Sequence, residues 1–221
     1  MATFHPPRDN LPAEFAVFPL SGALLLPRGK LPLNIFEPRY LAMTEDALAD
    51  RRMFAMIQQD PHAPATKHGP GLYRIGCLGR LTSFNETDDG RFLLTLTGIQ
   101  RFAIAEELAN HRGYRRVRAD FTGFPADLDL TPEPSGVERE ALLIALKAYF
   151  AGQKFDANWD AIRRMPDELL VVTLSMVCPF EPAEKQALLE APTEADRAAT
   201  LLALLQMGAA GSDLPPGRQA S

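Results

Sequence analysis

The residues with the clearest potential for chemistry form a basic run, HRGYRRVR, from His111 to Arg118. If residues 113–121 form a strand, Tyr114, Arg116 and Arg118 share one face, because successive side chains of a strand alternate between its two sides. Such a face can follow phosphates while the aromatic ring stacks on a base. The chain, however, has a formal charge of −5, and its acids are concentrated after residue 118. We therefore favour a solvated strand face balanced by acids of the helical half, and keep as an alternative RNA binding through Tyr114, Arg115, Arg116 and Arg118.

His62, His68 and Cys77 are the metal-binding residue types that lie nearest to one another in the sequence. Their spacing matches no zinc-binding pattern and no CxxC occurs, so the sequence predicts no metal site. No GxxxxGK[ST], GxSxG or HExxH sequence is present either. These patterns supply a phosphate-binding loop, an activated serine or a catalytic zinc. Their absence favours a protein without enzymatic activity and without a cofactor.

A leucine-rich segment from Leu24 to Leu33 is the best candidate for a peptide-binding surface. Its prolines and Gly29 interrupt a regular strand, so apolar side chains can stay partly exposed on an irregular loop. Leucines exposed in this way can receive apolar parts of an unfolded chain. Burial of the same leucines in a β-barrel core is an equally good interpretation. The candidate contacts are Leu24, Leu25, Leu26, Leu31, Leu33 and Phe36.

This segment leads directly into a change from strand to helix at the sequence FEPRY. Pro38 disfavours the helical conformation for Glu37 before it, and its own fixed φ suits the first turn of a helix. The sequence therefore predicts that a helix begins here. We expect Glu37, Arg39 and Tyr40 to fix this junction, with Glu37 or Arg39 paired internally. Arg101 is a candidate partner.

Short apolar runs separated by turn signals predict a β-rich region that is followed by helices. The Asp89-Gly90 pair predicts a hairpin turn. Gly98 is expected to divide the extended run that follows this turn into two strands. The expected fold is α+β: a β-barrel or sandwich with one inserted helix, followed by a helical C-terminal part. The predicted divisions are a flexible arm at 1–14, a β-rich region at 15–121, a linker at 122–136, a helical region at 137–208 and a disordered tail at 209–221.

Three stretches resemble, in the same order, the N-terminal domain of Lon protease, the substrate-recognition region of an ATP-dependent protease. They are FPLSGALLLPRGKLPLNIFEPRYLAM from Phe18, IGCLGRLTSFNETDDGRFLLTLTGIQRFAI from Ile75 and EKQALLEAPTEADRAATLLALL from Glu184. The likeness covers most of residues 15–207. It implies a PUA-like β fold followed by helices, in a domain that recognises polypeptide without cleaving it.

The first hypothesis is therefore a non-catalytic module that binds unfolded or exposed polypeptide segments, an adaptor or modulator of proteolysis with a protease or chaperone as partner. RNA binding is the second hypothesis, and a small-molecule site between the β-rich and helical parts is the third. No signal sequence and no apolar stretch of about 20 residues is visible. The two cysteines have no paired spacing. We therefore expect a cytoplasmic protein that does not enter a membrane.

Overall fold

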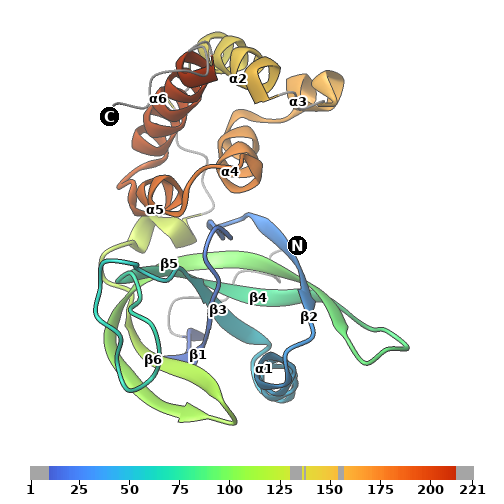
Figure 1. Ribbon diagram of the computed structural model, residues 1–221, viewed down its shortest axis with the longest axis vertical. Helices are drawn as coiled ribbons and strands as arrows, with labels where there is room; N and C mark the ends of the chain where they lie inside the picture. The colour runs from blue at the N-terminus through green and yellow to red at the C-terminus, as the bar shows by residue number, and fades with distance from the viewer. Residues whose placement is uncertain (1–9, 130–135, 137, 154–156, 213–221) are drawn as a thin grey trace, which may run out of the picture.

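The computed structural model describes residues 10–129, 136, 138–153 and 157–212, and it places a β-rich part beside a helical part (Figure 1). This arrangement confirms the predicted α+β class. None of the described helices is long and apolar enough to cross a membrane.

Six strands and one helix form the β-rich part. They are β1 (Glu14–Pro19), β2 (Lys30–Ile35), α1 (Pro38–Ala49), β3 (Met53–Ile57), β4 (Ile75–Glu86), β5 (Phe92–His111) and β6 (Tyr114–Asp120). The strand order is β2-β5-β4-β3-β1-β6, and a further pairing between β5 and β6 closes five of the strands into a barrel. β2 lies outside this ring and pairs with no described strand except β5. One edge of β2 is therefore unpaired within the described chain.

The strand β5 runs without interruption through Gly98, so the predicted break there is wrong. A Cβ atom at Gly98 would lie 2.0 Å from the carbonyl oxygen of Leu26. Gly98 therefore serves close packing of the leucine-rich segment against β5, and it does not end the strand.

The helix α1 begins at Pro38 as predicted, because Glu37 before it is extended (φ −74°, ψ 133°). Glu37 and Arg39 pair with each other at 2.9 Å on the surface, while Tyr40 is buried against Phe18 with 4.2 Å between ring centroids. The expectation that Arg101 joins this junction is wrong.

The described residues of the helical part form a 3₁₀ turn and five helices. They are η2 (Pro125–Leu128), α2 (Arg139–Gln153), α3 (Trp159–Arg164), α4 (Asp167–Val177), α5 (Pro182–Glu190) and α6 (Glu194–Ser212). The predicted helix end at Gly208 is wrong, since α6 continues to Ser212. A Cβ at Gly208 would lie 2.4 Å from the Tyr149 ring, so this glycine lets α6 approach α2 closely.

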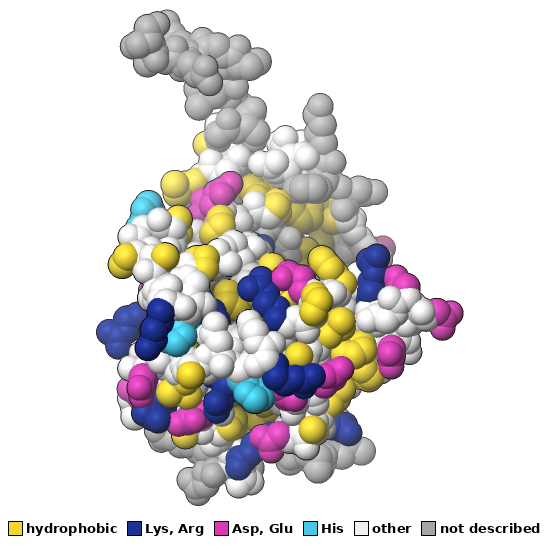
Figure 2. Space-filling model, turned by 60° about the horizontal axis from the view of Figure 1, so that its bottom comes forward, with side chains coloured by type: hydrophobic (Ala, Val, Ile, Leu, Met, Phe, Trp, Pro, Cys, Tyr) yellow, Lys and Arg dark blue, Asp and Glu magenta, His cyan; other side chains and the backbone are white. Residues whose placement is uncertain are grey.

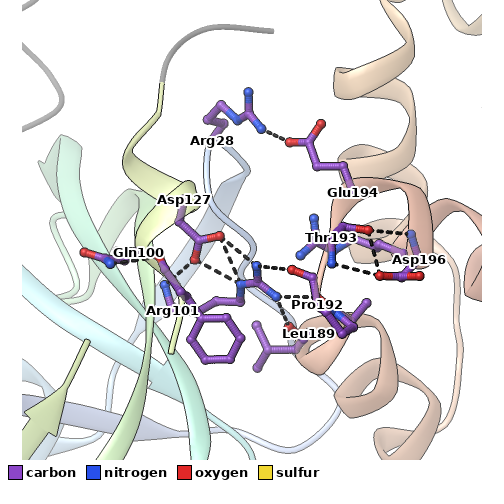
Figure 3. A network of polar contacts seen from close by, with 12 residues as sticks. Arg28, Gln100, Arg101, Asp127, Leu189, Pro192, Thr193, Glu194 and Asp196 are labelled. Carbon is purple, nitrogen blue, oxygen red and sulfur yellow. Dashed lines mark hydrogen bonds and ion pairs between the residues drawn. The ribbon is translucent and has the colours of Figure 1, made fainter. Parts of the chain in front are cut away.

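Arg101 of β5 joins the barrel to the helical part, and Figure 3 shows its contacts. Its Nη2 and Nε atoms donate to the Asp127 carboxylate at 2.8 and 2.9 Å. Its Nη1 donates to the carbonyl oxygens of Leu189 (3.0 Å) and Ala191 (2.5 Å), at the C-terminal end of α5. Carbonyls at a helix C-terminus have no intrahelical donor and carry partial negative charge. A cation from the barrel therefore caps a helix of the other part.

A second set of buried polar contacts lies at the start of α5. Gln58 of the β3–β4 loop donates to the carbonyl oxygen of Pro182 (3.0 Å) and to Gln186 Oε1 (3.1 Å). Lys185 is buried as well and donates to the Gly22 carbonyl oxygen at 2.7 Å. Burial lowers the pKa of Lys185 below its ordinary value. Both ends of α5 are thus hydrogen-bonded to the barrel.

Tyr114 of β6 fastens the barrel to α1. Its hydroxyl donates to Asp46 Oδ2 at 2.8 Å, and Arg112 Nη1 donates to Asp46 Oδ1 at 2.6 Å. Burial alone would raise the pKa of Asp46, but these hydrogen bonds hold it below its ordinary value. Burial, and then the bond to Asp46, raises the pKa of Tyr114 to about 12.

Replacing Arg101 by Met leaves the Asp127 carboxylate buried without its cation, so we expect the free energy of unfolding to fall by about 3–5 kcal/mol. Urea unfolding followed by circular dichroism measures the change. The double variant Arg101→Met, Asp127→Leu should recover part of the loss, because no unpaired charge remains. Arg118→Gln removes an exposed, ion-paired arginine and is the matched control, with a much smaller expected effect. A loss in Arg101→Met no larger than in this control would contradict the account.

Replacing Tyr114 by Phe removes a hydrogen bond to a carboxylate, and we expect a loss of about 1–2 kcal/mol in the free energy of unfolding at pH 7. Asp46 has a folded pKa below its ordinary 3.8, so its contribution is present above that pH and disappears as the pH falls through the folded value. The difference between variant and parent should therefore shrink in acid. Urea titrations at pH 7 and below pH 3.8 test this. A difference that stays constant across this range would show that Asp46 is not involved.

Candidate functional site

The leucines at the centre of the predicted peptide surface are buried. Leu24, Leu25 and Leu26 are at most 1% exposed and belong to the apolar core. The close approach of this segment to Gly98 and Gly79 explains their burial, because Leu26 and Leu25 lie where a Cβ atom on those glycines would be. The expectation that these three side chains are partly exposed is therefore wrong, and they fill the core.

The remaining candidates lie on and after β2. Leu33 is buried and Leu31 is half-buried, with both side chains turned toward the core. Phe36, directly after the strand, is 62% exposed. Of the six predicted contacts, Phe36 is the one that presents a large apolar surface to solvent.

The register of β2 defines what its unpaired edge offers. Pro32 lies opposite Thr95 of the antiparallel partner β5 and has no N–H to donate. Directly opposed residues in such a pair either exchange two hydrogen bonds or none, so Pro32 and Thr95 exchange none. The backbone groups of Lys30, Pro32 and Asn34 consequently point to the unpaired side. We call these groups the β2 edge.

Exposed apolar side chains gather next to the β2 edge, at the base of the β4–β5 hairpin. Leu93 is 44% exposed and lies opposite Asn34, on the face of the sheet that also carries Pro32. Phe84 is 40% exposed, but it lies opposite Leu94 and packs on Phe92 at 5.0 Å, so it occupies the other face. Leu93 and Phe36 together form what we call the apolar tip. Figure 2 shows hydrophobic side chains beside the protruding, charged end of this hairpin.

Sequence reasoning missed Phe84 and Leu93. Both belong to runs predicted as strands, and nothing in their spacing distinguishes them from core residues. The available signal was the predicted turn at Asp89-Gly90, since residues near a hairpin tip can extend past the layers that cover a sheet. The structure shows that this hairpin does so (Figure 1).

The basic run is neutralised within the barrel, and Tyr114 is 5% exposed. The ion pairs are Arg115 with Glu107 (2.6 Å), Arg116 with Glu14 (3.4 Å), and Arg118 with Glu14 (2.8 Å) and with Glu106. The balancing acids of these three arginines come from β1 and β5, and those of Arg112 come from α1, so their predicted origin in the helical half is wrong. A phosphate backbone would have to displace these carboxylates. The Tyr114 ring is buried, so a base could not stack on it.

The remaining candidates for metal binding or nucleophilic chemistry are either far from one another or buried. Cys77 is fully buried, which raises the pKa of its thiol, and the His68 ring lies 3.1 Å from Asn110 Oδ1. No group of three or more His, Cys, Asp or Glu within the described ranges is arranged to hold a metal ion. Ser175 is buried, and its Oγ has no hydrogen-bond partner among the described residues.

A pocket of about 340 Å³ lies where the barrel meets the helical part. Its polar lining consists of Arg28, Arg101, Asp127, Asp129, Thr193, Glu194 and Arg197. Figure 3 shows part of this lining, with Arg101 and Asp127 facing the first turn of α6. The pocket lies in the region where sequence reasoning placed a small-molecule site.

Two curated relatives show the extent of the similarity in sequence. The chain is 27% identical to the Lon protease of Anaeromyxobacter dehalogenans over 143 residues, which are 63% of this chain and 16% of that protein. It is 28% identical to Lon protease 1 of Bdellovibrio bacteriovorus over 199 residues, which are 86% of this chain and 24% of that protein. The chain thus spans a quarter or less of the length of these relatives.

Solved structures show the same fold. The Lon N-terminal domain protein from Xanthomonas campestris matches with a TM-score of 0.57 and 21% identity, over 86% of this chain and 97% of that one. The N-terminal domain of Lon protease from the Mycobacterium avium complex matches with a TM-score of 0.59 and 14% identity, over 89% and 98%. The family model for the ATP-dependent protease La (Lon) substrate-binding domain matches residues 14–207. The chain therefore belongs to the Lon substrate-binding domain family.

Proposed function

We propose that the chain binds unfolded or exposed polypeptide segments along the β2 edge, with apolar side chains of the segment resting on the apolar tip. The observation that carries this proposal is the coincidence of an unpaired strand edge with the exposed side chains Phe36 and Leu93. Membership of a family of substrate-binding domains supports it.

The physical basis is strand addition. An extended segment hydrogen-bonds to the outward N–H groups of Lys30 and Asn34 and to the outward carbonyl groups of Lys30, Pro32 and Asn34, which gives affinity without dependence on sequence. Pro32 offers no N–H, so the pairing lacks one hydrogen bond at its centre. Every second side chain of that segment then lies on the same face as Phe36 and Leu93. Binding therefore favours segments that are both extended and apolar, and such segments are exposed mainly in unfolded proteins.

The proposed role is that of a non-catalytic adaptor or modulator of proteolysis, with a protease or chaperone as partner. The match to the substrate-binding part of Lon proteins supports this role. A cytoplasmic location belongs to the same proposal, and the two free cysteines agree with a reducing compartment. RNA binding is less well supported, because Arg115, Arg116 and Arg118 are ion-paired.

The double variant Phe36→Ser, Leu93→Ser should weaken binding of a fluorescent unfolded polypeptide by roughly tenfold or more, since each side chain loses apolar contact area. Fluorescence anisotropy at low and moderate salt measures this. Parent binding should change little with salt, because apolar contacts do not release counterions. The matched control is Ile144→Ser, Val177→Ser, which removes from α2 and α4 two apolar side chains that are at least as exposed as Phe36 and Leu93. Equal losses in both double variants, or binding of single-stranded RNA alone, would refute the proposal.

The variant Asn34→Pro should reduce polypeptide binding because it removes a second outward N–H from the β2 edge, where Pro32 already offers none, and leaves Lys30 as the remaining N–H donor. Asn34→Ala is the matched control, since it changes the side chain and keeps the N–H. We expect Asn34→Ala to bind like the parent and Asn34→Pro to bind several-fold more weakly, with unchanged circular dichroism confirming the fold. If both variants bind like the parent, the segment does not add to β2.

A further inference from the structure

We propose that the pocket between the barrel and α6 binds an oxyanion, a carboxylate or phosphate group, through Arg197 and the first turn of α6. This inference does not depend on the proposed polypeptide binding. It starts from the charges that the fold brings together in this pocket, where three arginines from distant parts of the chain meet: Arg28 before β2, Arg101 in β5 and Arg197 in α6.

Two of the three arginines have carboxylate partners. Arg101 pairs with Asp127 at 2.8 Å, and Arg28 pairs with Glu194 and lies 3.9 Å from Glu168. Asp129 also lines the pocket and makes an interaction of its own. The positive charge without a carboxylate partner among the described residues is therefore that of Arg197.

Arg197 is buried but incompletely hydrogen-bonded. Arg197 is 3% exposed, and its Nε donates to the Leu188 carbonyl oxygen at 3.0 Å. Its Nη2 has no hydrogen-bond partner in the described part of the chain. A buried guanidinium N–H without an acceptor costs free energy. The Nη2 atom is closed off from solvent in the free chain, whereas Arg197 as a residue lines the pocket. An oxyanion there would meet the guanidinium charge, and a small rotation of the side chain would bring the unused N–H to it. Burial, and then the neighbouring Arg101, lowers the pKa of Arg197 to about 10, so it remains charged at neutral pH.

The first turn of α6 supplies further donors to the same pocket. Thr193 and Asp196 form a reciprocal cap, in which the Asp196 N–H donates to Thr193 Oγ1 (3.1 Å) and the Thr193 N–H to Asp196 Oδ2 (3.2 Å). The next two N–H groups, of Glu194 and Ala195, have no intrahelical acceptor, and both residues line the pocket. An anion at this end of a helix is also favoured by the helix dipole.

The size of the pocket restricts the ligand. A volume of about 340 Å³ accommodates a phosphate, a small carboxylic acid or the end of an acidic side chain. Because its walls come from both the barrel and α6, a bound oxyanion would stabilise the folded chain by mass action. This linkage provides the measurement.

The experiment records the melting temperature of the protein against rising inorganic phosphate and, separately, acetate, with sodium chloride holding the ionic strength constant. A saturable rise in either series, absent with chloride alone, is the expected result. A rise with phosphate alone identifies the ligand group as phosphate, and a rise with acetate alone identifies it as carboxylate.

Two single substitutions predict opposite changes. Ala195→Glu places a carboxylate at the exposed first turn of α6, where it favours the helix but repels the ligand, so the rise should disappear. Glu194→Gln frees Arg28 and should tighten the apparent affinity by roughly threefold to tenfold. Asp160→Asn, a change of equal charge on α3 away from the pocket, should leave the affinity unchanged. A rise that chloride reproduces, or that persists in Ala195→Glu, would overturn the proposal.

Discussion

The structure depends most on the side chain of Arg101. It pairs with Asp127, which fixes η2 on the barrel, and it donates to the last carbonyl groups of α5. Arg197 adds a second cation to the same helix end through Leu188. The helical part is therefore positioned by hydrogen bonds with directional requirements as well as by the shared apolar core, and apolar contact alone would allow it to slide.

This junction also determines what is left open elsewhere. Five strands close into a barrel, which removes their edges, while β2 is held on one side by β5 and reaches toward α4 at Gly29. A Cβ on Gly29 would clash with Met176 and Val172 of α4, so that end of the strand is covered. The remaining edge, next to Phe36, is accessible. Among the described strands, closure of the barrel and attachment of the helices thus leave the edge of β2 next to Phe36 unpaired.

Local chemistry could be predicted from the sequence, and the long-range partners could not. Pro38 determines where α1 begins, and the Asp89-Gly90 pair determines where the hairpin turns. Both signals act through the backbone conformations of the residues themselves. The partner of Arg101 was missed because Asp127 lies in a stretch with the composition of a linker, and the other acceptors are backbone carbonyls, which every residue has. The burial of Leu24–Leu26 depends on Gly98 opposite them, a contact that only the folded chain defines.

The buried cations raise the question of why the junction is not purely apolar. Arg101, Arg197 and Lys185 are each at most 7% exposed, and burying a cation is unfavourable unless acceptors replace its water. Backbone carbonyls at the end of α5 and at Gly22 supply most of them. For Arg101 and Lys185 these acceptors take the place of water and account for the burial. The Nη2 atom of Arg197 has no acceptor among the described residues. Arg197 also has a structural role, since its Nε donates to the Leu188 carbonyl oxygen at the same helix end as Arg101.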